Sequence, residues 1–272
     1  MRMASDQQTP ARGPGIVSWI LRTPLALLRA ALIIPWILAG LFAVGIIYPF
    51  ASTPQRARMN RRWSRVLLGM CGLRVSVHGD PILNHAVLYV ANHISWIDIF
   101  VMNAVRPTAF IAKSEIRGWP IVGWLVAGAG TVFIERGQRR AVQGVADAMR
   151  VRFDAGEAVG LFPEGTTSDG SGLLPFHPSL FEPARIAAAP IQPVALCYSA
   201  EGTREAFPAF VGEETLVTNV FRLLLARHLR VSVRYLPILE SGDQDRIALS
   251  RSAYEGIGAV IQSSAPPAPP TH

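Results

Sequence analysis

The chain contains very little lysine and cysteine. Lys113 is the only lysine, so the basic residues, 26 in all, are almost entirely arginines. An arginine surface suits bidentate binding of phosphates, and it is equally what a GC-rich genome would encode. The only cysteines, Cys71 and Cys197, both lie in apolar segments. They offer no disulfide framework and no metal-binding spacing, which favours a reducing cytoplasm.

Several chemical signatures are also missing. The six histidines show no paired ligand spacing, and we therefore predict that the protein binds no metal and needs no bound cofactor. No G-x-S-x-G elbow is present, which argues against a serine hydrolase. The arginines have no interleaved aromatic platform, so we expect no nucleic-acid partner despite a formal net charge of +7.

Charged residues are absent from 30 to 55, although half of the 272 residues are hydrophobic. This run is long enough to span a bilayer, but Pro35 should break its helical hydrogen bonding, and Gly40 and Gly45 should weaken the helix further. Basic flanks place both ends on the cytoplasmic side. We therefore predict a re-entrant or interfacial helical hairpin at the cytoplasmic face of the inner membrane. A single span and a buried helical pair are the alternatives. The flanking arginines are Arg12, Arg22, Arg29, Arg56, Arg58, Arg61, Arg62 and Arg65.

Composition divides the chain into four parts. Residues 1–15 are polar and contain Pro and Gly, which predicts a flexible leader. Residues 16–66 form the membrane-associated helical segment with its arginine-rich flank. Residues 67–262 form the main domain. Residues 263–272 end in P-P-A-P-P-T-H, which predicts a disordered Pro-rich tail.

Within the main domain, short β-rich runs alternate with longer helical patterns. This alternation predicts an α/β fold with a mostly parallel central sheet and helices on both faces, preceded by the N-terminal apolar helical hairpin. Ligands in such sheets collect beyond the strand ends. The predicted strands are 73–78, 86–91, 108–112, 131–135, 158–162, 191–198 and 229–235. The predicted helices are 97–105, 115–128, 138–155, 179–189, 213–228 and 244–262.

The first chemical motif follows the strand at 86–91. His93 and Asp98 are five residues apart, and Asn92 or Ser95 could cap the helix that begins there. If the chain turns back, the carboxylate can accept a proton from Nδ1 of the imidazole and leave Nε2 as a general base. Alone this is weak evidence, because a single His–Asp pair is more often structural than catalytic.

Three further motifs follow in order. L-F-P-E-G-T-T-S-D-G (161–170) holds Glu164 at a strand exit, with hydroxyl side chains beside it. G-T-V-F-I-E-R-G (130–137) places Arg136 at another strand end, where it could bind a phosphate or carboxylate. Q-P-V-A-L puts Pro193 near the start of a strand. Each alone is equally consistent with an ordinary loop, a surface arginine or an edge strand.

Together, N-H-x-S-W-x-D, G-x-x-F-I-x-R, F-P-E-G-T and the P-V strand resemble the four blocks of the glycerolipid acyltransferase family. That family includes the 1-acylglycerol-3-phosphate acyltransferases, and the resemblance covers about residues 75–200. It implies transfer of a fatty acyl group from a thioester of acyl carrier protein or CoA to a lysolipid hydroxyl at the membrane surface. By this resemblance His93 is the general base and Asp98 orients it. The implied acceptor-site residues are Phe133, Arg136, Phe162, Pro163, Glu164, Gly165, Thr166 and Thr167.

The chain departs from the family pattern where the acceptor is bound. Thr167 and His177 stand where family members that acylate phosphate-bearing lysolipids often carry basic residues. F-P-E-G-T-T-S-D-G resembles the lyso-ornithine lipid acyltransferases, whose acceptor has a carboxylate and an amine but no phosphate. We therefore expect lyso-ornithine lipid as acceptor, with lysophosphatidic acid as the alternative. A backbone N–H near Gly130 or Gly165 could stabilise the oxyanion.

Two other classes of function remain open. His93 and Asp98 could activate water in a lipid or thioester hydrolase. Alternatively, the arginines and the apolar run could serve a non-catalytic membrane-binding protein.

Overall fold

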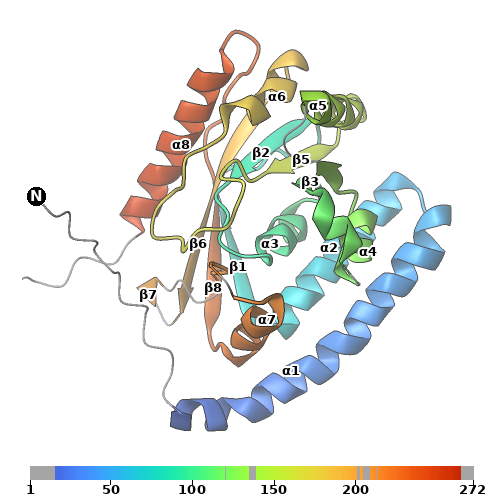
Figure 1. The fold of residues 1–272 in the computed structure, drawn as a ribbon, viewed down its shortest axis with the longest axis vertical. Coiled ribbons are helices and arrows are strands. Elements are labelled where there is room, and N and C mark those ends of the chain that lie inside the picture. Colours follow the sequence, from blue (N-terminus) through green and yellow to red (C-terminus); the bar gives the residue numbers. More distant parts are fainter. Residues whose placement is uncertain are drawn as a thin grey trace, which may run out of the picture.

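The computed structural model describes residues 16–119, 121–134, 139–200, 203–204, 209–212 and 214–264 (Figure 1). The predicted leader at 1–15 and nearly all of the predicted tail lie outside these residues. The described part is an α/β structure in which helices cover both faces of one sheet, as the sequence predicts.

The sheet has the strand order β1-β8-β6-β2-β5-β3-β4, and β7 pairs with β6. Most neighbouring strands are parallel; β6 is antiparallel to both β8 and β7. Every strand predicted from the sequence is present, and the short β7 was not foreseen. The strands are β1 (Leu73–His78), β2 (Val87–Ala91), β3 (Thr108–Lys113), β4 (Val132–Ile134), β5 (Ala158–Leu161), β6 (Ile191–Ala200), β7 (Thr203–Arg204) and β8 (Leu229–Tyr235).

Two layers of helices bury the two faces of this sheet. Strand β2 is buried throughout, and its side chains alternate between two cores. Tyr89 joins the core beneath α2, α3 and α7, whereas Leu88 and Val90 join the core beneath α5, α6 and α8. Continuous apolar strands are what a sheet covered on both sides requires. The helical segments of the main domain are α3 (Asp98–Val105), η3 (Ser114–Gly118), α4 (Val122–Gly128), α5 (Arg139–Asp154), η4 (Pro178–Phe181), α6 (Glu182–Ile186), α7 (Leu216–Leu225) and α8 (Arg246–Ser263).

The N-terminal segment forms one long apolar helix followed by a basic one. Helix α1 (Ile16–Phe42) continues directly into π and 3-10 turns, η1 (Ala43–Ile47) and η2 (Tyr48–Phe50), before α2 (Thr53–Met70) runs back. The expectation that Pro35 breaks the apolar run was wrong, because α1 passes through both Pro24 and Pro35. The chain turns at Ser52 instead, where Ser52 and Gln55 form a capping box that starts α2. The hairpin therefore has one apolar arm and one basic arm.

Helices α1 and α2 are joined by two tryptophans. The indole N–H of Trp36 donates to the carbonyl of Trp63, and the indole of Trp63 donates to the carbonyl of Trp36. The two rings stack with centroids 6.5 Å apart. The reciprocal bonds satisfy both polar groups inside an otherwise apolar contact.

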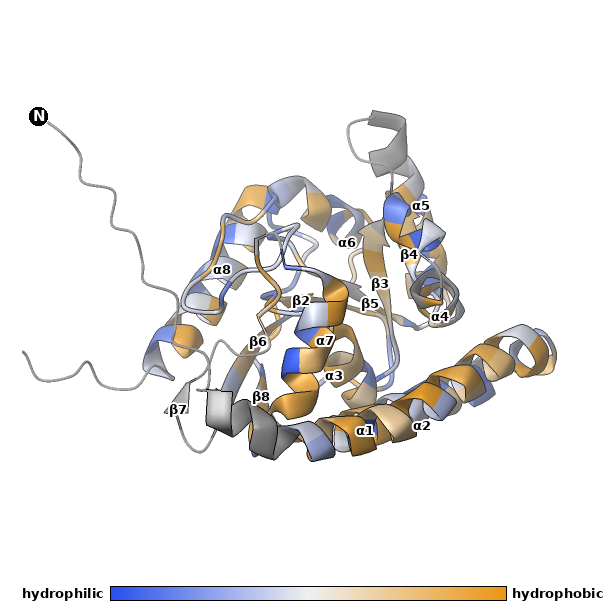
Figure 2. Ribbon diagram, turned by 60° about the horizontal axis from the view of Figure 1, so that its bottom comes forward, coloured by the Kyte–Doolittle hydropathy of each residue, from blue (hydrophilic) through white to orange (hydrophobic). Residues whose placement is uncertain are grey.

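The outer face of α1 is apolar and uncovered (Figure 2). Leu38 is 57% exposed and Phe42 59%. The segment Thr23–Phe50 is long and apolar enough to cross a membrane, a test that a signal sequence or a core helix also passes. Part of the neighbouring arginine cluster has a structural role, since Arg61 and Arg65 donate to the carbonyl of Ala104 at the end of α3.

Candidate active site

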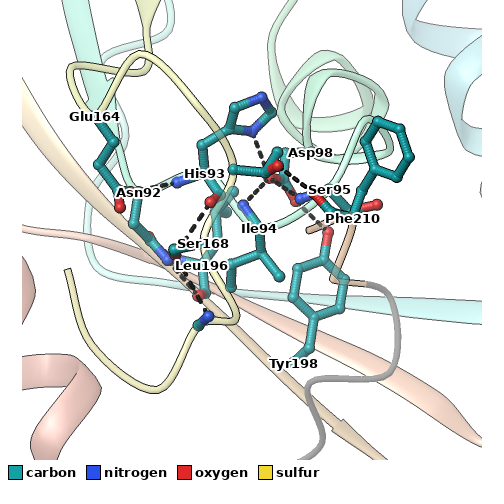
Figure 3. A network of polar contacts seen from close by, with 12 residues as sticks. Asn92, His93, Ile94, Ser95, Asp98, Glu164, Ser168, Leu196, Tyr198 and Phe210 are labelled. Carbon is teal, nitrogen blue, oxygen red and sulfur yellow. Dashed lines mark hydrogen bonds and ion pairs between the residues drawn. The ribbon is translucent and has the colours of Figure 1, made fainter. Parts of the chain in front are cut away.

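The loop between β2 and α3 brings the first predicted pair together (Figure 3). Nδ1 of His93 lies 2.9 Å from Oδ2 of Asp98. Asp98 is the first residue of α3 and is fully buried, whereas the side chain of His93 is 19% exposed. A buried carboxylate thus holds an imidazole that still reaches the surface of the site.

Asp98 is the centre of a hydrogen-bond network. Its Oδ2 also accepts from the backbone N–H groups of Ile94 (2.7 Å) and Ser95 (2.9 Å). Its Oδ1 accepts from the hydroxyl of Tyr198 at 2.6 Å. Because these partners are donors, the carboxylate accepts from Nδ1–H of His93 as well, and the lone pair of Nε2 stays available.

The helix cap expected from the sequence takes a different form. Neither Asn92 nor Ser95 caps α3. Asn92 exchanges two hydrogen bonds with the backbone of Leu196 on β6, and Asp98 itself closes the turn. The carboxylate can do so because it accepts several N–H groups at once, whereas each amide or hydroxyl supplies fewer acceptor sites.

Two aromatic rings support the imidazole. The ring of His93 stacks on Phe162, with centroids 4.0 Å apart and planes inclined by 10°. Phe162 stacks in turn on Phe110 of β3, at 5.1 Å. The stack restricts rotation of the imidazole out of the plane set by Asp98.

Glu164 lies directly behind the histidine loop. It is 4% exposed. Its Oε1 accepts from the backbone N–H of His93 at 2.8 Å, and its Oε2 accepts from the N–H of Leu174 at 2.9 Å. Burial raises the pKa of the Glu164 carboxyl, and the two backbone hydrogen bonds oppose that shift. Glu164 therefore braces the backbone of the site, and acceptor binding by this residue stays a prediction.

The rest of the F-P-E-G-T loop is tied to the same turn. Gly165 has φ +70°, a conformation that favours glycine. The N–H of Ser168 donates to the carbonyl of His93 at 2.8 Å. The hydroxyl of Thr167 donates to the carbonyl of Phe210, whereas Thr166 is exposed and Pro163 is buried. Their predicted contacts with substrate stay predictions.

The second predicted block is only partly described. Phe133 on β4 pairs with Ala112 of β3 and therefore shares a sheet face with Phe110. The guanidinium of Arg117 lies 5.7 Å from the centroid of the Phe133 ring. Arg136, the predicted anion-binding residue, lies outside the described residues.

The glycine amides considered for the oxyanion are already engaged. The N–H of Gly130 donates to Ala127, and that of Gly165 donates to Phe162. These two N–H groups each close their own turn, and a donor from a neighbouring backbone N–H of either loop stays a prediction. Within the described residues, no group of three His, Cys, Asp or Glu side chains could hold a metal ion.

Tyr198 and Asn219 are not among the residues predicted from the sequence. Tyr198 follows the P-V motif on β6, and its place near the histidine loop could have been predicted from the sequence. Parallel strands β2 and β6 end at the same edge of the sheet, so a tyrosine near that end of β6 could reach the histidine loop. Asn219 on α7 had no such signal; its amide accepts from the indole of Trp96 and donates to the carbonyl of Ala209.

The sequence of this domain matches known proteins. Residues 74–197 match the model of the Acyltransferase family. A lyso-ornithine lipid O-acyltransferase of Pseudomonas aeruginosa is 35% identical over 218 residues, which cover 79% of this chain and 83% of that protein. This chain belongs to the acyltransferase family.

Other members of the acyltransferase family extend the comparison. A 1-acyl-sn-glycerol-3-phosphate acyltransferase of Neisseria gonorrhoeae is 40% identical over 191 residues, 69% of this chain and 74% of that protein. The crystal structure of the 1-acyl-sn-glycerophosphate acyltransferase PlsC from Thermotoga maritima superposes with a TM-score of 0.64 over 90% of this chain and 97% of the other, at 21% identity. The family resemblance and the fold predicted from the sequence are confirmed. The acceptors in the names of these relatives differ: lyso-ornithine lipid in one and 1-acyl-sn-glycerol-3-phosphate in the other.

Proposed function

We propose that this acyltransferase moves a fatty acyl group from an acyl thioester to the hydroxyl of lyso-ornithine lipid in membrane lipid biosynthesis. The observation that carries the proposal is the 2.9 Å contact between Nδ1 of His93 and the buried carboxylate of Asp98. The names of several relatives support the lysolipid class.

The chemistry follows from that contact. Nε2 of His93 removes the proton from the acceptor hydroxyl while the hydroxyl oxygen attacks the thioester carbonyl carbon. A C–O bond forms, the C–S bond breaks, and its electron pair leaves with sulfur. The imidazolium, stabilised by Asp98, returns the proton to the thiolate. A thioester is already activated, so the step needs no serine nucleophile.

Thr167 supports the choice of acceptor. A family arginine at this position would offer a guanidinium to an acceptor phosphate. Here the hydroxyl of Thr167 is bonded to the carbonyl of Phe210, so the side chain faces the protein's own backbone. This suits an acceptor without a phosphate. The alternative activity is 1-acylglycerol-3-phosphate acylation, which yields phosphatidic acid.

The co-substrates and location are part of the same proposal. Acyl carrier protein and acyl-CoA are both acidic and suit a chain with a net charge of +7. The exposed apolar face of α1 and the exposed arginines of α2 would hold the protein at the cytoplasmic face of the inner membrane, where lysolipids reside.

An acceptor panel tests the proposal. Purified protein is given one labelled acyl thioester with lyso-ornithine lipid, with lysophosphatidic acid or with no acceptor, and products are identified by mass spectrometry. We expect ornithine lipid as the main product and little free fatty acid. Release of fatty acid without acceptor would identify a hydrolase.

The base is tested with His93→Ala, which should lower transfer by about 100-fold or more because general-base catalysis is lost. His85→Ala is the control, since that side chain is exposed. Full turnover in His93→Ala would exclude the mechanism. For the acceptor, Thr167→Arg should raise the ratio of lysophosphatidic acid to lyso-ornithine lipid acylation, and an unchanged ratio would contradict the role assigned to this position.

A further inference from the structure

The catalytic carboxylate has a partner that neither the motifs nor the family blocks include. The hydroxyl of Tyr198 lies 2.6 Å from Oδ1 of Asp98, and the two residues are 100 positions apart in the chain. Tyr198 is buried on β6. It therefore reaches Asp98 from behind, on the side opposite the imidazole (Figure 3).

We propose that Tyr198 is a positioning residue that fixes the orientation and tunes the basicity of Asp98, and through Asp98 the proton affinity of His93. The inference rests on the function proposed above and deepens it. Tyr198 touches neither the imidazole nor any group assigned to the substrate.

The geometry explains what the hydroxyl does. Oδ2 of Asp98 is shared by Nδ1 of His93 and by the N–H groups of Ile94 and Ser95, which leaves Oδ1 as the free end of the carboxylate. A donor at Oδ1 prevents rotation about the carboxylate bond and satisfies an oxygen that no water can reach. It also withdraws negative charge from the carboxylate, so Asp98 attracts the His93 proton less strongly than an unpaired aspartate would.

The protonation states fit this role. Burial and the charge of Asp98 both raise the pKa of Tyr198 well above its ordinary value, so the phenol keeps its proton and acts as donor. Among the described residues, the charged or titratable groups that face His93 are Asp98, through its side chain, and Glu164, through the backbone N–H of His93. Tyr198→Phe leaves both of these groups in place and removes only the donor to Oδ1 of Asp98.

The test is Tyr198→Phe with Tyr235→Phe as the matched control. Tyr235 is also a buried tyrosine, on β8, and its hydroxyl has no hydrogen-bond partner in the described structure. Each variant loses one hydroxyl from the sheet, but only Tyr198→Phe loses a hydrogen bond to Asp98. Thermal denaturation checks that each variant is folded.

Two measurements decide the proposal. In the Tyr198→Phe variant we expect kcat to fall by about tenfold, as for loss of a hydrogen bond to a charged group, with KM values for both substrates unchanged. The acid limb of the kcat/KM profile should move to higher pH, because the less stabilised carboxylate holds the imidazolium proton more tightly. Tyr235→Phe should leave kcat and the profile unchanged.

The second measurement does not depend on turnover. NMR titration of the His93 imidazole should give a higher pKa in Tyr198→Phe than in wild type. In the Asp98→Asn background the same substitution should produce no shift, because the carboxylate that transmits the effect is gone. An unchanged His93 pKa in folded Tyr198→Phe would overturn the proposal, whereas loss of the proposed function is indicated separately by full activity of His93→Ala.

Discussion

Two buried carboxylates act on His93 in different ways. Asp98 binds the side chain through Nδ1, and Glu164 binds the backbone N–H. Asp98 contacts the imidazole ring itself, whereas Glu164 acts on it through the backbone and through its charge. Glu164 fixes the position of the Cα atom, and its second oxygen ties the same loop to Leu174. The glutamate of F-P-E-G-T therefore supports the backbone of the site, and this role does not depend on any contact with substrate.

This arrangement predicts the effect of Glu164→Gln. Glutamine has one acceptor oxygen, so one of the two backbone N–H groups loses its partner in a buried site. We expect a loss of about 1–3 kcal/mol in the free energy of unfolding and a lower kcat. Chemical denaturation and initial-rate assays measure the two effects. Unchanged stability would show that water replaces the lost acceptor.

The raised pKa of Glu164 also predicts a pH dependence. Because the folded-state pKa of this acid lies above its unfolded value, the folded protein binds the proton more readily than the unfolded chain does. The contribution of Glu164 to stability is therefore largest below the ordinary glutamate pKa and declines as the pH rises through the raised folded pKa. Glu164→Gln removes this contribution, so the difference in stability between wild type and variant should grow as the pH is lowered through that window. Thermal melts across the acidic range test this, and a difference that does not change with pH would contradict it.

Among the elements, α1 and α2 approach each other closely at a glycine. A Cβ atom at Gly40 would lie 2.7 Å from Nε1 of Trp63 and 3.2 Å from Leu125 of α4. The Trp63 indole is held by its bond to the carbonyl of Trp36 and cannot move without breaking it. Gly40 therefore allows the close packing of α1, α2 and α4, a role that its helix-weakening character in the sequence does not reveal.

We expect Gly40→Ala to lower the free energy of unfolding by about 1–3 kcal/mol, the usual cost of overpacking. Gly45→Ala is the matched control, because nothing lies within 4 Å of its Cβ position. The control should be neutral or stabilising by up to about 1 kcal/mol, as expected from helix propensity. Equal stability of the two variants would mean that the helices separate freely at Gly40.

Aromatic contacts continue from this hairpin to the turn that contains His93 and Asp98. Trp63 packs on Phe100 of α3, and Phe100 packs on Trp96, which lies between His93 and Asp98 in the chain. The N-terminal helices are thus joined to the active-site loop by packed side chains rather than by a flexible linker.

For the whole molecule, the uncovered face of α1 predicts membrane binding. Leu38 and Phe42 lie one helical turn apart and are both more than half exposed. In the Leu38→Asp/Phe42→Asp double variant each carboxylate would cost up to about 3 kcal/mol in the apolar layer. Affinity for anionic vesicles, measured by sedimentation, should fall by at least about tenfold.

Val151→Asp is the control, since Val151 is 68% exposed on α5 and belongs to the other helical layer. Binding should also weaken with salt if the α2 arginines contact head groups. Undiminished binding by the double variant would favour a helix that packs on protein.

Extraction with alkaline carbonate separates the interfacial model, which predicts release, from a single span, which predicts retention.

The sequence by itself determined the main strands and the proximity of His93 to Asp98. Strand runs at 73–78 and 229–235 occur as predicted, because apolar β-branched patterns bounded by turns depend on local chemistry. The His93–Asp98 contact was equally accessible, because five residues in one turn bring the two side chains together. Recognition of the family rested on these same local motifs.

Only the tertiary structure decided what surrounds the dyad. Strand β2 lies between β5 and β6, and this order places Glu164 and Tyr198 on the two sides of the histidine loop. Strand order depends on how distant segments pack, which no local pattern records. The continuation of α1 through Pro35 was likewise visible only in the structure, because a proline within an apolar run predicts a break as readily as a helix that continues.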